Sequence, residues 1–67
     1  MEKLKKILKE ANITQLEIAK KLDIKSLSTV NLKLNGKAII TTTEAKLLRN
    51  LINEKMQSNY TIEELFE

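Results

Sequence analysis

The 67-residue sequence has no cysteine, histidine, proline or tryptophan, and it contains a single glycine. Without cysteine the chain can form neither a disulfide nor a thiolate metal site, and without histidine a zinc site would need carboxylates alone, which zinc rarely uses. The sequence also lacks a glycine-rich phosphate loop and a carboxylate pair placed for acid–base work. We therefore expect no metal, no cofactor, no small-molecule substrate and no enzymatic activity.

Long apolar runs are also missing, since no more than three apolar residues follow one another. A bilayer-spanning helix needs roughly 20, and the lysines of the first nine residues are not followed by an apolar signal segment. We expect a cytoplasmic protein with no membrane contact. A chain of this length has one core, which buries roughly 60% of the surface that the unfolded chain exposes. One domain, residues 1–67, is therefore predicted.

The near absence of helix breakers predicts an all-α fold, a compact bundle of about five short helices. The first helix is expected over residues 2–11, where apolar residues recur at three- and four-residue spacing. These residues are Leu4, Ile7, Leu8 and Ala11. Gly36 is expected to mark the one sharp chain reversal that needs a residue without a Cβ atom.

Three Thr-x-x-Glu motifs predict where later helices begin, because a threonine N-cap and a glutamate three residues on can satisfy each other's backbone amides. The motifs are Thr14 with Glu17, Thr41 with Glu44, and Thr61 with Glu64. The helix that follows Thr14 is expected to end near Leu22. The next helix is expected to run from a cap at Ser26 or Ser28 to about Leu34.

Charge is distributed unevenly along the chain, whose net charge is +3. Residues 1–37 contain nine lysines and four acidic residues, whereas residues 38–67 contain three basic and five acidic residues. A basic half suits a module that presents one face to a polyanion, although a lysine-rich solvated surface has the same composition.

Residues 14–36 predict a helix-turn-helix, with Asp23-Ile24-Lys25 as the turn. The motifs in and after this stretch are Thr14-Gln15, Ile18-Ala19-x-x-Leu22, Ser28-Thr29-Val30, Lys33-Leu34-Asn35-Gly36-Lys37 and Thr41-x-x-Glu44-Ala45. In this order and spacing they resemble the Cro/C1-type (XRE-like) helix-turn-helix proteins of temperate phages and Gram-positive bacteria. The resemblance covers nearly the whole chain and implies a lambda repressor-like DNA-binding domain in a phage-type transcriptional regulator that acts at an operator.

The resemblance also implies DNA contacts by position. Gln15 matches a glutamine that anchors to a phosphate at a helix N-terminus. The positions that match base-edge contacts are Leu27, Ser28, Asn31 and Leu32, and the expected DNA-binding set also includes Ser26, Lys25, Lys33 and Lys37. Asn31 can pair with adenine, serine with any base, and leucine with a thymine methyl. The three lysines are phosphate contacts or solvated charges.

A second hypothesis is an antirepressor or modulator that binds a repressor protein of a phage. Leu16, Leu27 and Leu32 stand where polar side chains are more typical of the family, so a protein-interaction surface of these leucines and Asn31 is the alternative. A third possibility is that the turn places Leu27 in the core, in which case no protein partner is needed.

Direct DNA recognition by so small a module calls for a homodimer on a two-fold operator, because one copy makes few base contacts. The exposed parts of the last two helices are where we expect the dimer interface. Leu47, Tyr60 and Phe66 are the candidates there, with core packing as the alternative and as the favoured position for Phe66.

Overall fold

Five α-helices form within residues 2–66, the part of the chain that the computed structural model describes. They are α1 (Glu2–Glu10), α2 (Gln15–Leu22), α3 (Leu27–Leu34), α4 (Thr42–Met56) and α5 (Ile62–Phe66). The predicted all-α fold is confirmed. The predicted domain, residues 1–67, includes Met1 and Glu67, which lie outside the described residues.

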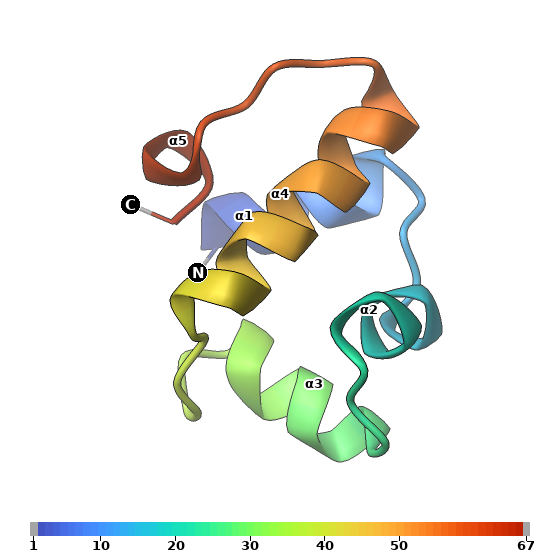
Figure 1. Cartoon of the computed structure of the whole chain (residues 1–67), viewed down its shortest axis with the longest axis vertical. Coiled ribbons are helices and arrows are strands. Elements are labelled where there is room, and N and C mark those ends of the chain that lie inside the picture. The colour runs from blue at the N-terminus through green and yellow to red at the C-terminus, as the bar shows by residue number, and fades with distance from the viewer. Residues whose placement is uncertain (1, 67) are drawn as a thin grey trace.

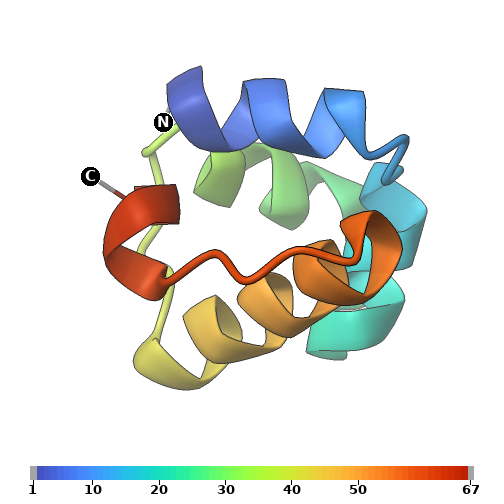
Figure 2. The same ribbon diagram turned by 90° about the horizontal axis from the view of Figure 1, so that it is seen from above.

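Helix α4 is the longest helix and crosses the middle of the molecule, with α1 behind it in Figure 1. Helix α2 packs against α3 and α4 at one end, and α5 packs against α1 and α4 at the other end. Seen from above in Figure 2, α1 and α4 lie on opposite sides of the bundle, and α5 bridges them. Helix α3 is thereby left at the periphery.

The core takes at least one side chain from each helix. Its most deeply buried members are Leu4, Ile18, Val30, Leu48, Ile52 and Leu65. The predicted inner stripe of α1 is confirmed for three of its four residues, because Leu4, Ile7 and Leu8 are buried. Ala11 follows the end of α1 and is half-buried against the same core.

All three predicted capping boxes are confirmed. At α2, Glu17 N donates to Thr14 Oγ1 over 3.2 Å and Thr14 N donates to Glu17 Oε1 over 3.1 Å. Thr41 and Glu44 make the same pair of bonds at α4, both 3.1 Å, and Thr61 and Glu64 make them at α5 over 3.2 and 2.9 Å. These bonds fix three helix starts through contacts only three residues apart in the chain.

Four residues end the helices α1 to α4 in the left-handed region, which corrects the expectation that Gly36 alone does so. Asn12 and Asp23 have φ of 57°, Gln57 has 51° and Gly36 has 74°. At the first two, the residue that follows donates its amide to a carbonyl five positions back, at 3.0 and 2.8 Å. These bonds form the Schellman motif, which offsets the steric cost that a Cβ atom brings.

The N-terminus of α3 differs from those of α2, α4 and α5, which have capping boxes. Ser26 is its N-cap residue, as one of the two alternatives predicted, but its side chain makes no capping hydrogen bond within residues 2–66. Its Oγ lies 3.1 Å from Ser28 Oγ instead. The expected serine cap bond is therefore wrong, because the two hydroxyls pair with each other.

Candidate nucleic-acid interface

Helices α2 and α3 pack against each other, and their inner faces are buried in the same core. Ile18 and Leu22 of α2 and Val30 and Leu34 of α3 are buried in it. The turn between them is closed by Ile24 N, which donates to Ala19 O over 2.8 Å, and the half-buried Ile24 side chain packs against the core. The pairing fixes which side of α3 faces outward.

The outward side of α3 carries the four side chains predicted for base edges. Leu27, Ser28, Asn31 and Leu32 are all exposed. Leu27 exposes 48% and Leu32 43% of its surface, so the alternative in which Leu27 enters the core is wrong. Asn31 lies among them with its amide at the surface.

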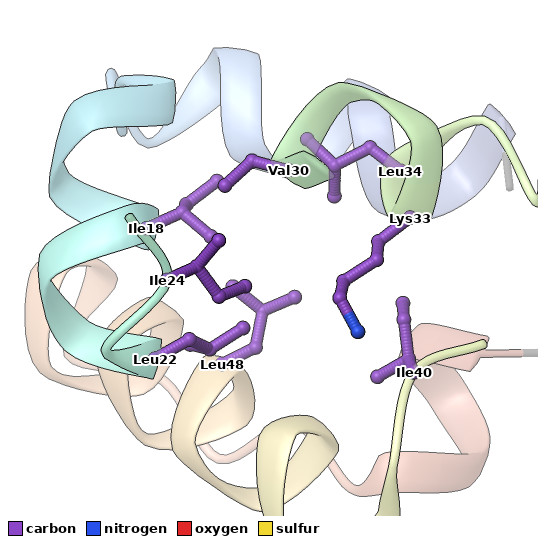
Figure 3. Close-up of a pocket in the computed structure, with 8 residues that line it drawn as sticks. All are labelled: Ile18, Leu22, Ile24, Val30, Lys33, Leu34, Ile40 and Leu48. Atoms are coloured by element: carbon purple, nitrogen blue, oxygen red, sulfur yellow. The ribbon is translucent and has the colours of Figure 1, made fainter. Parts of the chain in front are cut away.

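Lys33 lies on a different side of α3, which corrects the expectation that it reaches outward to a phosphate. Its side chain is 14% exposed, and its Nζ donates to Glu44 Oε1 over 2.8 Å and to Ile39 O over 2.7 Å. Figure 3 shows the side chain pointing from α3 into the space beside Ile40 and Leu48. Lys33 therefore ties α3 to the start of α4.

Hydrogen bonds from lysines lower the pKa of Glu44 and of Glu17. The hydrogen bond from Lys33 lowers the pKa of Glu44 below its ordinary value of 4.5, against a smaller opposing effect of burial. The hydrogen bond from Lys55 likewise lowers the pKa of Glu17, and the 2.9 Å ion pair connects α2 to α4. Both carboxylates therefore hold the helix-turn-helix on α4 rather than face a ligand.

The exposed cations beside α3 come from several elements. Lys25 precedes α3 and Lys37 follows it, and both are exposed as predicted. Lys5 and Lys9 of α1 line a groove with Gln15 of α2, next to the C-terminal end of α3. The sequence did not point to these two lysines individually, although their four-residue spacing places them on one side of α1.

Gln15 is the first residue of α2 and is half-buried, so it occupies the helix-start position that the sequence predicted. Lys5 also reaches the C-cap residue of α3, because its Nζ donates to Asn35 Oδ1 over 2.8 Å. The groove thus joins α1, the start of α2 and the end of α3. A hydrogen-bonding side chain at a helix N-terminus beside two lysines is chemistry suited to a phosphate oxygen.

A family model described as helix-turn-helix matches residues 4–59 of the chain. The chain belongs to the Cro/C1-type helix-turn-helix family. No curated protein and no solved structure matched it significantly. The helix-turn-helix protein is accordingly a DNA-binding regulator by family.

The residues expected at a dimer interface of this helix-turn-helix protein are only partly available. Leu47, Tyr60 and Phe66 are half-buried and pack against the core. Tyr60 is held by Asn53 of α4, whose Oδ1 accepts from Tyr60 N over 2.9 Å and whose Nδ2 donates to Tyr60 O over 3.1 Å. Sequence reasoning missed this role of Asn53, because no local pattern connects residues seven positions apart across a turn.

No helix within residues 2–66 of this helix-turn-helix protein is long and apolar enough to cross a membrane. The described residues also contain no group of three acidic side chains placed to hold a metal ion.

Proposed function

We propose that the protein binds a double-stranded DNA operator through the outer face of α3 and represses transcription there by blocking polymerase. The observation that carries this proposal is the exposed face of α3, which presents Ser28 and Asn31 away from a core that holds the other side of the helix. An α-helix fits the major groove, where amide and hydroxyl groups can read base edges.

The proposed interface assigns each side chain a distinct contact. Ser28 and Asn31 hydrogen-bond to bases, while Leu27 and Leu32 meet apolar groups such as thymine methyls. Ser26 and Lys25 at the start of α3 and Lys37 after its end, together with Gln15 at the start of α2, hold the phosphates on either side. Lys33 is left out of this set because Glu44 and a backbone carbonyl already occupy its ammonium.

The proposal includes a homodimer on a two-fold operator with half-sites about one helical turn apart. A recognition helix of eight residues offers four outward side chains to the bases, which limits the discrimination of one copy. Phe66 and Ile62 of α5, with Ile40 and Ala45, line an apolar groove that a second copy could cover. Sedimentation with and without operator DNA tests this part.

DNA binding is tested by titrating the protein against the DNA that flanks its own gene, at two salt concentrations. We expect a shift by the protein alone whose affinity falls steeply with salt, because phosphate contacts release counterions. Asn31→Ala should cost about 1 to 3 kcal/mol at one base pair, whereas Gln15→Ala should weaken binding to all sequences alike. A wild-type protein that binds neither this DNA nor any member of a random library contradicts the proposal.

A protein partner is the second candidate, and the exposed leucines favour it. Leu16, Leu27 and Leu32 expose 54%, 48% and 43% of their surfaces. The hydrated major groove of DNA offers leucine few apolar contacts. Burying them against a repressor protein would contribute a few kcal/mol at about 25 cal/mol per Å² of apolar area. In this case the protein acts as an antirepressor that covers the repressor's own recognition helix.

Serine substitutions separate the two candidates. Under the partner hypothesis, Leu27→Ser or Leu32→Ser abolishes complex formation with the partner repressor protein. The wild-type protein alone then shows negligible DNA affinity. Under direct readout, the same variants alter base preference and leave the protein monomer fold intact, because both side chains are exposed. Circular dichroism of each variant provides the folding control.

A further inference from the structure

Three side chains form a hydrogen-bonded relay that runs from α1 to the recognition helix. Lys5 Nζ donates to Asn35 Oδ1 over 2.8 Å. Asn35 Nδ2 donates to Asn31 O over 2.8 Å and lies 3.1 Å from Asn31 Oδ1 as a second acceptor. Asn35 follows the last residue of α3, and Asn31 lies one turn before it on the exposed face.

The relay has a direction, because a lysine ammonium can only donate hydrogen bonds. Lys5 therefore turns the oxygen of the Asn35 amide toward α1, which leaves the Asn35 amino group toward Asn31. That amino group can only donate, so Asn31 must meet it with oxygen. The Asn31 backbone carbonyl can only accept, so it requires the same orientation of Asn35. The orientation of both amides thus follows from Lys5 and this carbonyl together and does not depend on telling nitrogen from oxygen by position.

We infer that Lys5 and Asn35 are specificity-determining positioning residues, which orient Asn31 so that it offers N–H donors to the DNA. This inference rests on the proposed DNA-binding function. An asparagine that pairs with adenine on two atoms must accept from N6 with Oδ1 and donate to N7 with Nδ2. Here one lone pair of Oδ1 accepts from Asn35 and turns that oxygen toward the C-terminal end of α3, whereas Nδ2, on the opposite side of the amide, keeps both of its protons available.

Guanine is the base whose major-groove edge fits two donors, because N7 and O6 are adjacent acceptors and no donor stands beside them. Adenine and thymine each present one acceptor next to a donor or a methyl group, and the cytosine amino group is a donor. The relay therefore favours guanine opposite Asn31, over the adenine that an unrestrained asparagine prefers. Lys5 keeps two further protons, which can contact the phosphate of the same strand.

Asn35→Asp reverses the relay with almost no change in shape. A carboxylate still accepts from Lys5, but it can donate neither to Asn31 O nor to Asn31 Oδ1. The bond to the backbone carbonyl is therefore lost, and Asn31 turns its amino group inward and presents its oxygen to the DNA. We expect the preferred base to change from guanine to one with an exposed amino group, cytosine or adenine. Lys5→Met removes one of the two groups that fix the orientation and should reduce the guanine preference without a new preference, and Lys5→Arg should restore it.

Lys9→Met is the matched control, since Lys9 lies one turn further along α1 in the same groove and no hydrogen bond to α3 is made by its side chain within residues 2–66. Loss of either lysine removes one charge, so both variants should bind all DNA sequences more weakly. Only the Lys5 variant should also change which base is preferred. This separates the positioning role from the electrostatic one.

The experiment is selection of binding sites from a random double-stranded DNA library by the wild type and each variant, followed by sequencing. We expect a single position in each half-site to favour guanine by roughly tenfold or more in the wild type, and to change identity in Asn35→Asp. If that position keeps guanine in both Asn35→Asp and Lys5→Met, the inference is overturned while the proposed function stands. If the wild type selects no DNA, the proposed function fails and the inference with it.

A measurement without DNA keeps the inference testable even where a variant folds poorly. In the free wild-type protein, proton exchange should be slower for the side-chain amide of Asn35 than for that of Asn31, because only the first has its donors hydrogen-bonded. Lys5→Met should narrow the difference between the two exchange rates, because one of the two groups that orient Asn35 is lost. Equal rates in the wild type would overturn the inference.

Discussion

Helices α3 and α4 share one core, but they are held in different ways. The 15 residues of α4 begin with a complete capping box, and the helix passes through the middle of the bundle. The eight residues of α3 begin without a side-chain cap within the described range and carry no acidic residue in the first turn. Local sequence therefore stabilises α4, whereas α3 depends on contacts from other elements.

Those contacts all reach α3 from its inner side and its C-terminal end. Val30 and Leu34 are buried in the core, Lys33 is paired with Glu44, and Asn35 accepts from Lys5. The N-terminal turn and the outer face of α3 remain exposed. A helix can therefore lack a side-chain cap and an acidic residue in its first turn when contacts on its inner side and at its C-terminal end hold it in place.

The largest effect is expected from a cavity in α4. Ile52 is fully buried, and Ile52→Ala should cost about 2 to 5 kcal/mol of unfolding free energy because it removes packed atoms from the centre of the core. A domain of this size is stable by only about 3 to 10 kcal/mol, so much of the variant should be unfolded. Urea unfolding followed by circular dichroism measures the loss, and a loss below 1 kcal/mol would show that α4 is not the central support.

A smaller loss is expected when α3 is detached from α4. Lys33→Met removes two charge-assisted hydrogen bonds of an ammonium that is mostly buried, which should cost about 1.5 to 3 kcal/mol. Lys25→Met, at an exposed position just before α3, is the control and should stay within about 0.5 kcal/mol of the wild type. Equal effects of the two substitutions in thermal unfolding would mean that the Lys33 pair does not hold α3.

The helix caps provide a direct contrast between α3 and α4. Thr41→Ala breaks the bond to Glu44 N and should cost about 1 kcal/mol, whereas Ser26→Ala should cost less than about 0.5 kcal/mol because no cap bond is lost. Both are measured by chemical denaturation under the same conditions. Similar losses at the two positions would remove the distinction between a locally stabilised helix and a dependent one.

The smallest effect is expected from pH. Glu17, Glu44 and Glu64 have pKa values below 4.5, because lysines and backbone amides donate to their ionised forms. A lowered folded-state pKa gives stability that is present above 4.5 and is lost as the pH falls through the folded values. The melting temperature should therefore be constant near neutrality and decrease below pH 4.5, less steeply in Glu44→Gln. A decrease that begins near pH 6 would contradict this assignment.

The helix starts could be read from the sequence because each capping box spans four residues, so its partners are neighbours whatever the rest of the chain does. The helix ends could not. Glycine was expected at the one left-handed position, yet Asn12, Asp23 and Gln57 adopt it too. Their conformations are stabilised by hydrogen bonds that close the helix ends and by packing of the residues that follow, such as Ile13 and Ile24. No single residue type in the sequence indicates this packing.

The candidate interface could likewise be predicted from the sequence only in part. The exposure of Leu27, Ser28, Asn31 and Leu32 followed from helical spacing once Val30 and Leu34 were assigned to the core. Lys33 occupies a flank of α3, where spacing alone allows either solvent or a neighbour. Its neighbour Glu44 was visible only as a capping residue, and the sequence offered no sign that one carboxylate serves both purposes.

The amino-acid sequence by itself determined an all-α chain, three of its helix starts and the helix-turn-helix pattern, since these depend on residues within one or two turns of each other. The tertiary structure alone decided that Lys33 faces α4 and that Lys5 reaches Asn35, because those partners lie 11 and 30 residues apart. Contacts over such separations form only after the core has fixed how the helices pack, and they determine which polar groups of α3 remain available to a ligand.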